Sequence, residues 1–215
     1  MNDMDLCNDE LLQGELNEIL EENTDLITVT NTAKTISVTI SPKILLQLYK
    51  ALKLKVNVMA LLITAHEQVL KHGLEFNSEC AIGIDIKSGK EITRDVSDLD
   101  KKDTVKLVIP SNYKGKLVAI HNHPYNSPFS TRDIHTFGTM RQLHCLSIQG
   151  HSGVAYTLIK TKNTYLKGSV DKLSEVFNNM RKEEIYKDKT TIEVGEIFVQ
   201  AIADKTGWIF LKGGD

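Results

Sequence analysis

Two histidines, a serine and an aspartate follow one another closely between His121 and Asp133. Two imidazoles and a carboxylate are the ligand set of a catalytic zinc ion, because three protein ligands leave one tetrahedral position for water. Zinc lowers the pKa of that water from about 15.7 toward roughly 7, so hydroxide is available at neutral pH. The sequence therefore predicts a zinc-dependent hydrolase with one Zn²⁺ per chain, held by His121, His123 and Asp133.

A predicted strand places the two imidazoles together. Residues 117–120 form an apolar run that is typical of a buried strand. Side chains two residues apart on a strand leave the same face, so His121 and His123 point the same way. Pro124 has no amide hydrogen and fits poorly inside a sheet, which predicts that the strand ends there and that residues 125–129 form a loop.

A predicted helix over residues 131–140 brings the carboxylate to the same place. Ser130 has the side chain of a helix N-cap, and the segment that follows has no proline and carries Ile134 and Phe137 on an inner face. Asp133 then lies in the first helical turn. From that position its carboxylate can reach back toward the histidines.

Hydrolysis also needs a group that transfers protons beside the metal. Glu79 stands at the head of residues 80–86, a second predicted strand that is expected to run next to the histidine strand. The Ser130 hydroxyl is placed to donate a hydrogen bond to a developing oxyanion. We therefore expect Glu79 and Ser130 to be catalytic.

Each of these residues has an ordinary structural explanation as well. Ser130 with Asp133 is the Ser-x-x-acid pattern of a capping box, which helices use to satisfy their first amide groups. His121 alone would be a hydrogen-bonded histidine, and other carboxylates lie near Glu79 in the sequence. The combined pattern favours the metal site, because all the parts occur at the predicted junction of strand and helix.

Together, these residues resemble the JAMM signature of the JAB1/MPN/Mov34 metalloprotease family. That signature is a glutamate, then His-x-His-Pro, a short loop and Ser-x-x-Asp. The resemblance implies that His121, His123 and Asp133 are the zinc ligands. It implies in addition that Glu79 is the general acid/base and that Ser130 supports the tetrahedral intermediate.

The resemblance covers about half of the chain, roughly residues 57–162. The loop between Pro124 and Ser130 is one residue shorter than in the eukaryotic deubiquitinases of the family, and the chain looks more like bacterial and phage-associated members that carry His-Asn-His-Pro. The implied fold is α/β (α+β), an MPN/JAB-like mixed β-sheet flanked by helices. The implied substrate is a protein or peptide, with a ubiquitin-like conjugate as one form of it.

The chain divides into three predicted parts. Residues 1–40 form an acidic N-terminal helix and hairpin extension, residues 41–165 the JAB/MPN-like metalloprotease domain, and residues 166–215 a C-terminal helical extension. The first 25 residues hold nine acidic and no basic side chains, which leaves 26 basic against 19 acidic residues in the rest, a charge of plus seven. The acidic helix is expected to dock on the body or on a partner protein, with a solvated terminus as the alternative.

Local patterns predict the remaining elements. A helix opens at Pro42 and a second ends at Gly73. The other predictions are a hairpin over 26–40, a strand over 104–109, a hairpin over 145–160, two C-terminal helices of which the second ends at Gly207, and an edge strand or anchor over 208–211.

Composition narrows the function classes. The chain has 215 residues, of which 41% are hydrophobic, enough for one buried core. Three widely spaced cysteines predict neither a disulfide framework nor a cysteine zinc site. No apolar run is long enough to span a bilayer and the first residues are acidic, so a cytoplasmic protein without membrane contact is expected.

Two alternatives to the hydrolase stay open. One is an MPN-like binding or assembly module of a phage or mobile element, although members of that kind usually lack the metal residues that are present here. The other is a DNA-processing role similar to that of RadC-type proteins, which rests on fold analogy. The letters HNH at 121–123 do not indicate an HNH nuclease, and the sequence offers no basic stripe for nucleic acid.

Overall fold

The computed structural model describes residues 27–31, 36–97, 104–161, 166 and 168–214. Its main strands are β3 (Cys80–Asp85), β4 (Glu91–Val96), β5 (Leu117–His123), β6 (Leu143–Gly150), β7 (Ala155–Ile159) and β8 (Ile209–Gly213). Its helices are α2 (Pro42–Lys50), α3 (Val56–Phe76), α4 (Thr131–Thr139), α5 (Val170–Met180) and α6 (Thr191–Thr206), with a 3-10 turn at Glu184–Tyr186. None of these helices combines the length and the apolar character needed to cross a bilayer.

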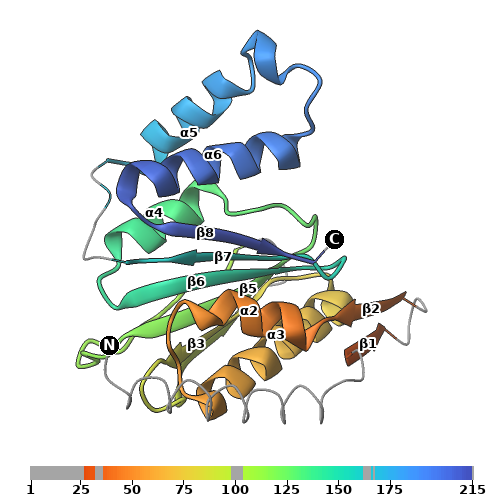
Figure 1. Ribbon diagram of the computed structural model, residues 1–215, viewed down its shortest axis with the longest axis vertical. Helices are drawn as coiled ribbons and strands as arrows, with labels where there is room; N and C mark the ends of the chain where they lie inside the picture. The colour runs from red at the N-terminus through yellow and green to blue at the C-terminus, as the bar shows by residue number, and fades with distance from the viewer. Residues whose placement is uncertain (1–26, 32–35, 98–103, 162–165, 167, 215) are drawn as a thin grey trace, which may run out of the picture.

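The six strands form one sheet in the order β4-β3-β5-β6-β7-β8. Strands β5 and β6 are parallel, and every other neighbouring pair in this sheet is antiparallel. Helices α2 and α3 cover one face, while α4 and α6 cover the other (Figure 1). The predicted mixed α/β class with a helix-flanked sheet is therefore confirmed.

Strand β5 lies inside the sheet, and each of its two faces contacts a different hydrophobic cluster. Val118 and Ile120 belong to the cluster under α3, whereas Leu117 and Ala119 belong to the cluster under α4. Side chains alternate along a strand, so the odd-numbered positions face α4 and the even-numbered positions face α3. This alternation decides on which side of the sheet the histidines emerge.

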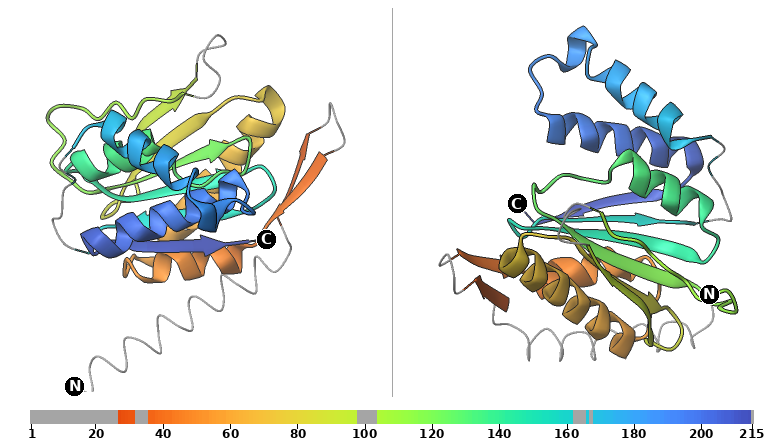
Figure 2. Two further views of the ribbon diagram at one scale, coloured as in Figure 1. Left: turned by 90° about the horizontal axis from the view of Figure 1, so that it is seen from above. Right: turned by 180° about the vertical axis from the view of Figure 1, so that it is seen from behind.

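Strands β1 (Ile27–Asn31) and β2 (Ile36–Ile40) form a separate antiparallel pair beside the main sheet (Figure 2). The predicted hairpin is thereby confirmed in its two strands. The predicted acidic helix lies outside the described residues, so its docking remains a prediction.

The predicted strand over residues 104–109 is wrong. These residues follow β4 without entering a ladder, and the Lys106 amide donates instead to the Asp95 side chain at 2.5 Å. Leu107 and Ile109 still pack against the cluster under α4. The alternating apolar pattern thus reflects packing on one side, and no strand pairing accompanies it.

The predicted helix end at Gly73 is also wrong. Helix α3 continues to Phe76 and ends at Asn77, which adopts a left-handed conformation with φ of 49°. Gly73 lies inside the helix at a close approach, because a Cβ atom there would lie 2.3 Å from Asn122 Nδ2 and 2.2 Å from His151 Nε2. The glycine is explained by this contact with the sheet.

The C-terminal segment takes part in the main core. Strand β8 pairs with β7 at the edge of the sheet, as one of the two predicted arrangements required. Trp208 is buried as well, with its ring 4.8 Å from the Phe137 ring on α4. Val199 and Ala203 of α6 are fully buried in the same cluster. Helix α6 and strand β8, which the sequence analysis placed in a C-terminal extension, therefore pack as part of the main core.

Candidate metal centre

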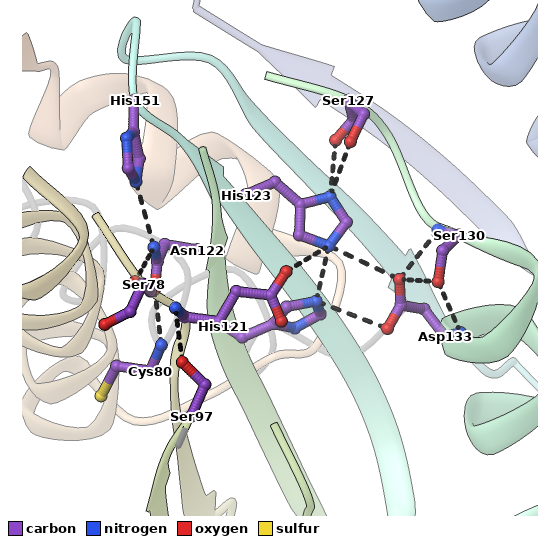
Figure 3. A network of polar contacts seen from close by, with 11 residues as sticks. Ser78, Cys80, Ser97, His121, Asn122, His123, Ser127, Ser130, Asp133 and His151 are labelled. Atoms are coloured by element: carbon purple, nitrogen blue, oxygen red, sulfur yellow. Dashed lines mark hydrogen bonds and ion pairs between the residues drawn. The ribbon is translucent and has the colours of Figure 1, made fainter. Parts of the chain in front are cut away.

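The structure brings His121, His123 and Asp133 together. Both histidines occupy odd-numbered positions of β5 and emerge on the face covered by α4, whose first turn carries the aspartate. His121 Nε2 lies 3.0 Å from His123 Nε2. The Asp133 oxygens lie 3.5 Å from these two nitrogens, Oδ1 from His121 and Oδ2 from His123 (Figure 3).

These separations fit a single metal ion. Nitrogen and oxygen ligands at about 2.0 to 2.1 Å from a tetrahedral zinc ion are about 3.4 Å from one another. The observed distances of 3.0 and 3.5 Å lie on either side of that value. The ligand atoms all lie within 4.8 Å of one another, and both histidines are buried. The group could therefore hold a metal ion, as the sequence predicted.

The loop after β5 fixes the protonation of His123. Its Nδ1 lies 2.9 Å from the Ser127 carbonyl oxygen, an acceptor, so the imidazole proton belongs on Nδ1. The lone pair of Nε2 then points toward His121 and Asp133. An outer partner of this kind sets the ring orientation and raises the basicity of a metal ligand.

The Asp133 carboxylate caps helix α4 and also faces the two histidines. Its Oδ2 accepts a hydrogen bond from the Ser130 amide at 2.8 Å while the Asp133 amide donates to Ser130 Oγ at 3.1 Å, which makes a capping box on α4. The Ser130 hydroxyl also donates to Oδ2 at 2.6 Å. Burial raises the pKa of Asp133, but His121, His123 and the Ser130 hydroxyl outweigh it and hold the pKa well below its usual range. The capping-box explanation is thus confirmed, and Oδ1 still faces the histidines.

Glu79 lies beside the three ligands, next to β3. Strands β3 and β5 are antiparallel, with Ala81 opposite His121, which places the glutamate near the end of the histidine strand. Its side chain is buried, and Oε1 is 3.9 Å from His123 Nε2. Ser130 is close by, but its hydroxyl is directed toward Asp133. All five residues singled out in the sequence therefore meet in one place.

A cleft of about 220 Å³ opens onto this group. Glu79, His123 and Asp133 line it together with the exposed side chains of Tyr125 and Arg132. The segment at Thr104 and Val105 contributes a further wall. The cleft is thus accessible from solvent, while the two histidines of the candidate metal centre are buried.

The two imidazoles differ in their affinity for protons. Burial lowers the pKa of His121 to about 4. For His123, burial acts in the same direction, but the hydrogen bond and the charge of Asp133 outweigh it and raise the pKa above its usual value. His121 is therefore neutral at pH 7, whereas a proton competes with a metal ion for His123.

Metal affinity is expected to fall about tenfold for each pH unit between pH 6 and pH 5, because one proton must leave His123 for each ion bound. The sign follows from the raised pKa of His123: affinity rises with pH and levels off above that pKa. Calorimetric titration in two buffers of different ionisation enthalpy measures the released proton. The matched control is His135→Ala on α4, which should leave the profile unchanged; a flat profile in the wild type would contradict the prediction.

Two further side chains that contact the site were not identified from the sequence. Ser127 orients His123, and Asn122, between the two histidines, contacts residues on either side of Glu79. The alternation of β5 could have indicated that Asn122 faces α3, but nothing local indicated its partners. Among the other histidines, His66 bonds to Tyr49 and Gln149 in the core, and His151 contacts Asn122.

No family model matches the chain, and neither the curated proteins nor the solved structures contain a significant match to it.

Proposed function

We propose that this protein is a zinc-dependent hydrolase of the JAMM type that cleaves a peptide or isopeptide bond. The observation that carries the proposal is the meeting of two imidazoles, one carboxylate and a second, buried carboxylate at the base of one open cleft. A structural zinc site would be expected to use four protein ligands, whereas this group offers three and leaves a position for solvent and substrate.

A bound zinc ion would supply a Lewis acid for the scissile carbonyl and a water molecule of lowered pKa. The side chains supply the rest. Glu79 takes a proton from the attacking water and delivers it to the departing amine, a role that its position 3.9 Å from His123 Nε2 allows. Ser130 can support the oxyanion only if its hydroxyl turns away from Asp133, to which it now donates.

We propose that the cleft takes an extended substrate. It is open to solvent, and the exposed Tyr125 and Arg132 side chains flank the buried base. An amide bond in a flexible peptide, or between a lysine side chain and a protein terminus, can enter such a cleft without unfolding of the substrate. We therefore assign proteins as the substrate class, with a ubiquitin-like conjugate as one form.

The test combines metal analysis with a search for cleaved bonds. Purified protein should contain one equivalent of zinc by plasma emission spectroscopy. Wild type and Glu79→Gln are then incubated with candidate conjugates and with cell extract, and new protein termini are mapped by mass spectrometry. Termini that form only with the wild type support the proposal. A protein without zinc, or with zinc and no new termini, would instead favour a binding module.

A further inference from the structure

Asn122 lies between the two candidate ligands in sequence but on the opposite face of β5. Its side chain is fully buried under α3. Its Oδ1 accepts a hydrogen bond from the Cys80 amide at 2.8 Å, and its Nδ2 donates to the Ser78 carbonyl at 3.0 Å (Figure 3). One amide group therefore spans the backbone on both sides of residue 79.

We propose that Asn122 is a positioning residue that holds Glu79 against the metal centre by clamping the backbone at Ser78 and Cys80. The inference rests on the proposed function, because it assigns the clamp to the general acid/base of that reaction. The clamp links the two faces of the sheet. The candidate metal ligands emerge on one face, and the Asn122 side chain, which holds Glu79, emerges on the other.

The amide chemistry of asparagine matches all three of its partners. The oxygen meets an N–H donor at Cys80, and the nitrogen has two hydrogens, one for the Ser78 carbonyl and one for His151 Nε2 at 3.0 Å. Turning the amide over would set N–H against N–H and oxygen against oxygen. A hydroxyl or an aliphatic side chain cannot make this set of bonds.

The surrounding structure leaves Asn122 little freedom to move. A Cβ atom at Gly73 of α3 would lie 2.3 Å from Asn122 Nδ2, so the helix approaches the clamp at the one position without a side chain. His151, half-buried in the turn after β6, meets the same Nδ2 at 3.0 Å, and the Gly73 position lies beside this contact. The helix and the turn thus confine the amide on the side away from the metal centre.

Glu79 itself is fixed from two directions. On the β4 side, its amide donates to Ser97 Oγ at 3.1 Å, and its carbonyl accepts from the Ser97 amide at 2.9 Å. On the β5 side, Asn122 holds the neighbouring peptide groups. A displacement of about 1 Å in a catalytic group costs up to about a hundredfold in rate, so a clamp at this point affects proton transfer directly.

The test uses cobalt(II) as the probe, because its visible absorption reports on the site without a substrate. The pH midpoint of the spectrum is measured for wild type, Glu79→Gln, Asn122→Ala and the double variant. A nearby carboxylate raises such a midpoint, so Glu79→Gln should lower it. Asn122→Ala should lower it in the same direction, and it should add no further shift in the Glu79→Gln background, because both act through one group.

The matched control is Gln149→Ala. Gln149 is a fully buried amide on the same face of the sheet, but its hydrogen bonds go to His66, Gly150 and Val154 instead of to the backbone around Glu79. It should destabilise the fold and leave the cobalt midpoint at the wild-type value. If Asn122→Ala does not fold, Asn122→Ser replaces it, since the hydroxyl keeps one polar group in the buried site but cannot make the set of bonds that the amide makes.

The outcomes separate the two proposals. A wild type that takes up no cobalt overturns the proposed function and the clamp together, and so does a Glu79→Gln variant with the wild-type midpoint. Normal cobalt uptake with a lowered midpoint in Glu79→Gln but not in the Asn122 variants overturns the clamp alone. A shift from Asn122→Ala that adds to that of Glu79→Gln also overturns it, because the residue would then act independently of the glutamate.

Discussion

The Glu79→Gln variant is expected to retain its metal ion and to lose hydrolytic turnover by about a hundredfold or more. The amide has nearly the shape of the carboxylate but cannot accept and return a proton, and general acid/base groups contribute about 10²- to 10⁴-fold to such reactions. The metal should stay because Glu79 is not one of the three candidate ligands; its Oε1 lies 3.9 Å from His123 Nε2. The loss should appear in kcat on the bond identified by terminus mapping.

Glu75→Gln is the matched control for this experiment. Glu75 lies on the last turns of α3, four residues before Glu79, and is exposed to solvent. Its replacement removes the same charge from the same part of the chain and should leave kcat unchanged. Full activity in Glu79→Gln with one equivalent of zinc would remove the glutamate from the mechanism.

The second expected result is the loss of the metal itself from His121→Ala and Asp133→Ala. Loss of a hydrogen-bond partner of a metal ligand lowers metal affinity by about 10- to 100-fold. Loss of a ligand itself should therefore lower the affinity by more than about a hundredfold. Competition with a chromophoric chelator measures the zinc affinity of each variant. The His144→Ala variant, whose histidine lies on β6 outside the site, should bind zinc like the wild type.

Asp133 needs a second variant because its carboxylate also caps α4. Loss of a cap costs about 0.5–2 kcal/mol, so Asp133→Ala weakens the helix start as well as the site. Asp133→Asn keeps an oxygen for the Ser130 amide but removes the charge. If the asparagine variant has near wild-type thermal stability and still loses zinc, the carboxylate is a ligand; if it binds zinc normally, the aspartate serves only the helix.

The candidate site was predictable because its signals are local. The spacing of His121 and His123 sets their common face, Pro124 ends the strand, and Ser130 marks the helix start, and all three inferences hold in the structure. The clamp was not predictable in the same way. Asn122 reaches partners 42 and 44 residues away in the sequence, and their proximity depends on the pairing of β3 with β5.

The errors in the fold have the same origin. Gly73 has the residue type of a helix end, but its reason is a contact with Asn122 and His151 that only the tertiary structure creates. Residues 104–109 alternate like a strand, yet nothing in their sequence shows that the ladder partner is missing. In both cases the structure of the segment depends on which residues it contacts in the folded protein.

The division of the candidate ligands between an inner strand and a helix start has a kinetic consequence. His121 and His123 belong to β5, which has a paired strand on each side, whereas Asp133 is joined to them by the loop after Pro124 and the first turn of α4. We therefore expect a bound ion to be exchanged through local opening of that loop and turn, with the sheet intact. Exchange of one metal for another should track the local opening of this segment and be much faster than global unfolding.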